Sequence, residues 1–144
     1  MPESIQTKVD RYLKQEAPDT NLLPPEQVLA LALAAVRKYT AYGELAVQRL
    51  QREAWEEAFK RDASTPRPQA VAIDKDLMVI PSEWAVISDL WSLYMERDQA
   101  KQMEASRGLG VDAFGRASSE IEADIRAEHE ALPMRAFWFG PFTV

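Results

Sequence analysis

Residues 25–42, PEQVLALALAAVRKYTAY, decide the fold class of this chain. The stretch is rich in Leu and Ala, which are among the strongest helix formers. Pro25 suits the first turn of a helix, because its missing N–H has no partner there. Apolar residues occupy most of the circumference of this helix, a pattern typical of a helix buried on several sides. The stretch therefore predicts a central helix with other helices packed around it.

Hydrophobic periodicity predicts two flanking helices, over residues 3–15 and 44–62. The first places four apolar residues on one face: Ile5, Val9, Tyr12 and Leu13. The second has a stripe with two aromatic residues beside it: Val47, Leu50, Ala54 and Ala58, with Trp55 and Phe59.

The longest predicted helix covers residues 81–107 and opens with Pro81 and Ser82. It carries a stripe at spacings of three and four: Trp84, Ile87, Trp91, Tyr94 and Met95. A stripe at this spacing is typical of core packing. The stripe ends at Met95, and the following residues, ERDQAKQMEASR, are mostly polar. We therefore expect the second half of this helix to project toward solvent or a partner.

A loop and a strand-like segment separate these two helices. STPRPQ, residues 64–69, contains two prolines that block both helix and strand continuation. AVAIDKDLMVI, residues 70–80, has β-branched residues on both sides of DKD, which is a plausible turn. The segment predicts either a short hairpin or an extended arm.

A last helix is expected to begin at Ser119, which forms a capping box with Glu122, and to end near Ala131. Pro133 is expected to stop it. Residues 133–144 then form an extended arm rich in aromatic residues: Phe137, Trp138, Phe139 and Phe142.

The sequence thus predicts a mainly α fold: a small helical bundle with one long helix, a short β-hairpin or extended loop and an extended C-terminal arm. It divides the chain into a helical domain, residues 1–132, and an aromatic docking arm, residues 133–144. The longest apolar run, VLALALAAV, has nine residues and is too short to span a bilayer. MPESIQTKVD lacks the basic start and apolar core of a signal peptide.

Composition and charge exclude several functions. The chain has no Cys, so disulfides, thiol nucleophiles and cysteine-ligated zinc are excluded. Its single histidine, His129, excludes a multi-histidine metal site within one subunit. The net charge is −6, of which residues 82–144 carry −5, and no basic run would neutralise phosphates as in a tight nucleic-acid binder.

Three motifs were weighed as catalytic sites. GLGVDAFG, residues 108–115, lacks the lysine of a phosphate-binding loop and favours a turn after a helix. His129 lies among carboxylates that would raise its pKa, and it is interpreted as a surface histidine near a helix end. Pairs such as Glu120 and Asp124 lie on solvated helix faces and give no sign of a cleft. No catalytic residue, cofactor or metal ligand is predicted.

The aromatic arm leaves two alternatives open. It either folds back onto the helices of its own subunit or inserts into a neighbour. Each buried aromatic residue would contribute roughly 1.5–3 kcal/mol of transfer free energy, less the cost of ordering the segment. Repeated around a symmetric ring, an inserted arm would hold subunits together or attach them to another component.

Residues 76–137, from DLMVIPSEW through ERDQA and RGLGV to MRAF, resemble the head-to-tail connector, or adaptor, proteins of tailed bacteriophages. The shared features are a DL…L-x-P-x-E-W lead-in, a long helix with an ER-x-x-A run, an R-G-L-G-V turn, a final helix and a C-terminal arm. The layout matches over residues 22–144, and motif-like identity is confined to about residues 76–116. The helix predicted over residues 3–15 is not explained by this resemblance.

The resemblance implies a helical virion protein without enzymatic chemistry. Such subunits assemble as a dodecameric ring beneath the portal protein, in the neck between head and tail, after synthesis in the host cytoplasm. The ring receives tail or collar proteins on its other face, and its bore continues the DNA channel. The acidic second half of the chain would let DNA pass without specific binding, because like charges repel.

Two sets of contact residues follow from this resemblance. The docking residues, which would meet the portal or a neighbouring copy, are Met134, Arg135, Phe137, Trp138, Phe139 and Phe142. The residues expected on the lumen or between subunits are Glu96, Asp98, Glu104, Glu120 and Asp124.

Two other classes of function remain open. One is a helical regulatory or interaction protein that oligomerises through its aromatic tail. The other is an enzyme, such as a wall-cleaving virion hydrolase, for which the sequence offers no suitable carboxylate pair.

Overall fold

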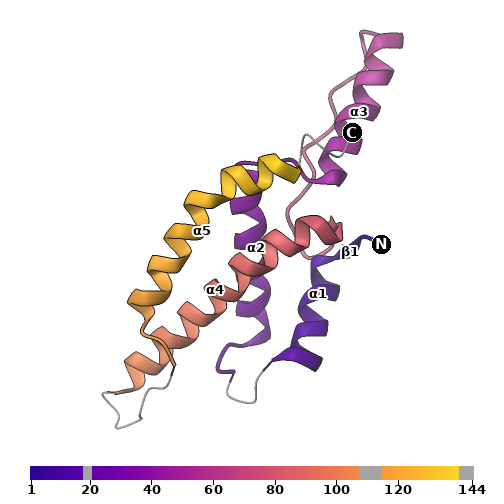
Figure 1. The fold of residues 1–144 in the computed structure, drawn as a ribbon. Coiled ribbons are helices and arrows are strands. Elements are labelled where there is room, and N and C mark those ends of the chain that lie inside the picture. Colours follow the sequence, from indigo (N-terminus) through magenta and orange to yellow (C-terminus); the bar gives the residue numbers. More distant parts are fainter. Residues whose placement is uncertain (18–20, 108–114, 140–144) are drawn as a thin grey trace.

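The computed structural model describes residues 1–17, 21–107 and 115–139, with side chains described up to Ala136. The fold is mainly helical, as predicted. Helices α2 (Pro25–Thr40), α4 (Pro81–Ser106) and α5 (Ser118–Phe139) form the bundle, in which α4 packs against both of the others. α5 runs back alongside α4, and α2 lies behind them (Figure 1).

The central helix is buried on several sides, as its sequence predicts. Val28, Ala32, Ala35 and Val36 of α2 are fully buried. Trp91 of α4 joins this core and donates a hydrogen bond from its indole nitrogen to the carbonyl oxygen of Val28, at 3.1 Å. This bond satisfies the only polar atom of a large buried side chain.

The N-terminal segment is part of the same core. A two-residue strand, β1 (Glu3–Ser4), leads into α1 (Ile5–Arg11) and a π-helical turn, η1 (Tyr12–Glu16). Ile5 and Val9 are fully buried against the bundle. The helix predicted over residues 3–15 is therefore present, with an extended start.

The hairpin alternative for residues 70–80 is wrong. Asp74 and Leu77 close the predicted turn around DKD, where the N–H of Leu77 donates to the Asp74 carbonyl at 3.1 Å. The following strand, β2 (Met78–Val79), then pairs antiparallel with β1, so that Glu3 lies opposite Val79. The extended segment therefore pairs with the N-terminal strand β1. This pairing places Val79 in the core, where it is buried.

The second half of α4 was expected to project toward solvent or a partner, and the structure corrects this expectation. Ala100 and Met103, in the second half of α4, are buried, so this half does not project from the fold. α5 lies along this part of the molecule and packs against α4.

Pro133 does not stop the last helix, which begins at Ser118 and continues to Phe139. Residues 133–139 are therefore helical and not extended. A proline inside a helix costs about 3 kcal/mol. Leu132 and Ala136, one turn apart on either side of Pro133, are both buried, and their burial offsets that cost.

Candidate functional site

A helical projection is the most unusual feature of the described fold. Helix α3 (Ala46–Arg61) and the return segment, residues 62–73, extend away from the bundle (Figure 1). We call them the α3 projection. None of the residues of α3 is buried, and Leu50 and Phe59 are 63% and 42% exposed. A helix of 16 residues is marginal alone in water, so this element lacks the packing that stabilises the others.

The return segment covers only part of α3. Trp55 donates a hydrogen bond from its indole nitrogen to the carbonyl oxygen of Thr65, at 3.4 Å. The Arg67 guanidinium lies over the Trp55 ring, at 5.4 Å from its centroid. Phe59 packs against Trp55 with ring centroids 5.1 Å apart. The far end of the projection is thus an aromatic pair with a cation against it, open to solvent on the Phe59 side.

A buried carboxylate fastens the base of the projection. Glu83, in the first turn of α4, is 5% exposed and is the buried charged residue among those described. Its Oε1 accepts from the N–H of Ala46 at 2.5 Å, and its Oε2 accepts from the N–H of Ile80 at 3.1 Å. Burial raises the pKa of Glu83, although the two backbone N–H groups act in the opposite direction. One side chain therefore caps the starts of both α3 and α4.

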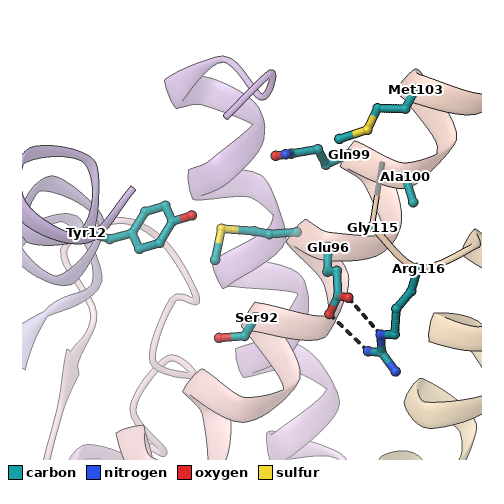
Figure 2. A pocket seen from close by; sticks show the side chains of 9 residues that line it. Tyr12, Ser92, Glu96, Gln99, Ala100, Met103, Gly115 and Arg116 are labelled. Atoms are coloured by element: carbon teal, nitrogen blue, oxygen red, sulfur yellow. Dashed lines mark hydrogen bonds and ion pairs between the residues drawn. The ribbon is translucent and has the colours of Figure 1, made fainter. Parts of the chain in front are cut away.

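A partly apolar groove lies between η1 and α4 (Figure 2). We call it the α4 groove. Its volume is about 260 Å³. Tyr12 faces α4 across the groove (Figure 2). It is lined by Tyr12, Ser92, Met95, Glu96, Gln99, Ala100, Met103, Gly115 and Arg116.

Charged groups close one edge of this groove. The Arg116 guanidinium forms two hydrogen bonds with the Glu96 carboxylate, at 2.9 and 3.0 Å (Figure 2), and an ion pair with Asp124. These two carboxylates raise the pKa of Arg116. The three side chains together carry one negative charge, so the edge of the groove is acidic.

The structure describes the side chains of two of the predicted docking residues, Met134 and Arg135. Met134 is 77% exposed on α5 and available for contact. Arg135 instead pairs within the chain, with Asp89 at 2.8 Å and Glu128 at 2.5 Å, and these carboxylates raise its pKa. The side chains of the aromatic docking residues lie outside the described part of the structure: Phe137, Trp138, Phe139 and Phe142.

The acidic residues expected at the lumen or between subunits also have structural roles. Glu104 accepts from the backbone N–H and the hydroxyl of Ser118, both at 2.8 Å, and so caps the start of α5. Ser119 consequently lies inside the first turn and is not the cap.

The other acidic residues of this set lie on α4 and α5. The Asp98 carboxylate accepts a hydrogen bond from the side-chain amide of Gln27 at 2.9 Å. Glu96 and Asp124 hold Arg116, and Glu120 is exposed at the start of α5. Their placement on a lumen stays a prediction.

His129 differs from its sequence interpretation. Its Nε2 lies 2.7 Å from the Tyr94 hydroxyl, at the interface between α4 and α5. Burial, Lys38 and Arg97 lower its pKa, whereas neighbouring carboxylates were expected to raise it. The expectation failed because packing between α4 and α5 partly buries the ring, which is the largest cause of the lowered pKa, and Lys38 and Arg97 act in the same direction.

The part of the chain that the structure describes contains no group of three His, Asp or Glu side chains arranged to hold a metal ion. Within the same residues, no helix is both long and apolar enough to cross a membrane. Comparisons with protein-family models, curated proteins and solved structures give no match.

The α3 projection and the α4 groove were not predicted as contact surfaces. The apolar stripe on α3 resembles that of any packed helix, and the sequence does not reveal that Leu50 and Phe59 are exposed. The sequence does contain a partial signal. STPRPQ, residues 64–69 of the return segment, is too polar and too proline-rich to bury that stripe.

Proposed function

We propose that this chain is a structural virion subunit that forms a ring between the phage portal and the tail and continues the DNA channel. Residues 76–137 supply the resemblance to head-to-tail connector proteins. The bundle of α2, α4 and α5 agrees with the helical layout that the resemblance implies. In this role the protein acts through surfaces and not through catalysis.

The observation that carries the proposal is the α3 projection. A helix of 16 residues, with Leu50 and Phe59 exposed, is held to its own fold mainly at its base by Glu83. Such an element is stabilised when another molecule covers its apolar side chains. The element is therefore expected of a subunit that completes its packing by assembly.

Charge supports the proposed channel. Residues 82–144 carry a net charge of −5, and this region supplies both α4 and α5. An acidic bore repels the phosphate backbone, so that DNA passes through without adhering. The residues proposed for the bore or the inter-subunit faces are Glu96, Asp98, Glu104, Glu120 and Asp124.

The aromatic segment remains the proposed docking element. Residues 137–144 contain four aromatic residues and no charged residue. Together with the exposed Met134, they would meet the portal or a neighbouring copy. Arg135 would strengthen this contact only by leaving Asp89 and Glu128.

Binding to a purified portal ring tests the proposal. The full chain and the portal protein of the same phage would be mixed, and the complex measured by native mass spectrometry. We expect a ring of this chain on the portal, with one copy for each portal subunit. If the chain does not bind the portal and forms a stable small oligomer alone, the proposal fails. That result would favour the alternative function, a helical regulatory protein that oligomerises through its aromatic tail.

A further inference from the structure

Two uncovered surfaces of this chain have complementary chemistry. The first is the tip of the α3 projection, residues 59–69, where Phe59 is 42% exposed. The second is the α4 groove, where the buried Met95 and Met103 and the partly buried Tyr12 face an empty volume of about 260 Å³. An aromatic ring packs favourably against methionine sulfur. The groove therefore suits the kind of side chain that the tip exposes.

The charges of the two surfaces are also opposite. The tip contains Lys60, Arg61 and Arg67 against one acid, Asp62, which gives a net charge of +2. The edge of the groove carries one net negative charge, from Glu96 and Asp124 with Arg116. Opposite potentials steer two surfaces together and fix their register.

The two surfaces cannot meet within one chain. α3 begins beside Glu83, whose Oε1 lies 2.5 Å from the Ala46 nitrogen. Phe59 is 13 residues further along α3, about 20 Å from this point. Gln99, in the middle of the groove, is 16 residues from Glu83 along α4, about 24 Å away. The two helices leave this point in different directions (Figure 1).

We infer that the tip of the α3 projection of one copy docks in the α4 groove of the next copy. The ring of Phe59 enters between Tyr12 and the two methionines, and the basic residues of the tip lie against the acidic edge. The two patches are different parts of the surface, so the contact is heterologous and generates a closed ring when repeated with the right rotation. This inference rests on the proposed function only in that copies of the chain lie side by side.

Engineered cysteines test this contact directly, because the chain has no Cys of its own. One pool would carry Ala63→Cys, an exposed position of the tip that leaves Phe59 in place, and the other Ser92→Cys, an exposed position that lines the groove. The two pools would be mixed under mild oxidation, alone at high concentration and on the portal ring. The matched control replaces Ser92→Cys by Glu130→Cys, which is exposed and does not line the groove.

We expect a mixed disulfide dimer between Ala63→Cys and Ser92→Cys, and about tenfold less of it with the control. Adding Lys60→Glu and Arg61→Glu to the first pool should reduce the cross-link about tenfold, since it places like charges together. Disulfides between two Ala63→Cys chains in place of the mixed dimer would overturn the inference. So would retention on the portal without the mixed dimer, a result that leaves the proposed function standing. Formation of the mixed dimer without binding to the portal would support the inference and contradict the proposed connector function.

Discussion

Removing the Glu83 carboxylate should loosen the base of the α3 projection and destabilise the fold. Glu83→Ala leaves the partly buried N–H groups of Ala46 and Ile80 without their acceptors. A hydrogen bond to a charged group contributes about 1.5–3 kcal/mol. The buried carboxylate also has a desolvation cost, shown by its raised pKa, and this cost disappears with it. We therefore expect a net loss of about 3 kcal/mol.

The loss is large enough to measure by thermal and denaturant unfolding followed by circular dichroism. For a chain of this length, about 3 kcal/mol lowers the melting temperature by roughly 10 °C. Glu83→Gln keeps one acceptor oxygen and should lose about half as much free energy. Limited proteolysis should show earlier cleavage within α3 in both variants.

Glu53→Ala is the matched control, because Glu53 is an exposed acid on α3 whose nearest ion-pair distance, to Arg49, is 4.0 Å. Such a surface pair contributes little, and the change should cost about 0.5 kcal/mol or less. A loss for Glu83→Ala no larger than that of this control would refute the argument that Glu83 holds the two helix starts together.

Three further predictions concern α5 and its neighbours. Because the pKa of His129 is lowered in the folded state, the unfolded chain binds a proton at this residue more readily, and stability should fall as the pH drops below about 6.5. His129→Gln should remove this part of the pH dependence of the melting temperature. An unchanged dependence in this variant would contradict the prediction. Gly43→Ala places a Cβ 2.9 Å from the Ala136 Cβ and should cost about 1–3 kcal/mol in denaturant unfolding, while a neutral effect would show that α5 approaches Gly43 less closely. A chain ending after Ala136 keeps the buried core of α5 and should fold but not bind the portal ring; its failure to fold would indicate that residues 137–144 belong to the core.

The sequence predicts the helices well because their periodic patterns are long. α2 and α4 lie within one or two residues of their expected ends. Pro25 and Pro81 mark their first turns, where proline is favoured. Such signals are local and need no knowledge of the rest of the fold.

The failures concern partners that are distant in sequence. β2 pairs with β1 about 75 residues away, and no local pattern identifies this partner. The polar second half of α4 looks exposed in sequence, but Ala100 and Met103 are buried in the packed bundle. Pro133 is tolerated because Leu132 and Ala136 pack into the core. In each case tertiary packing overrides a local signal.

In the candidate site too, contacts between residues distant in sequence were not predicted. Exposure of Met134 agrees with a docking role, whereas the ion pairs of Arg135 connect α5 to α4 within the chain. The projection that carries Leu50 and Phe59 has an ordinary amphipathic sequence, and only the three-dimensional arrangement reveals that both side chains are exposed.

The proposed role of this chain, a ring component between portal and tail, is tested most directly on purified phage particles whose genome encodes the chain. Quantitative mass spectrometry would compare the abundance of the chain with that of the portal protein. A ring stacked on the portal requires about one copy for each portal subunit. Absence of the chain from the particle would contradict the proposed role.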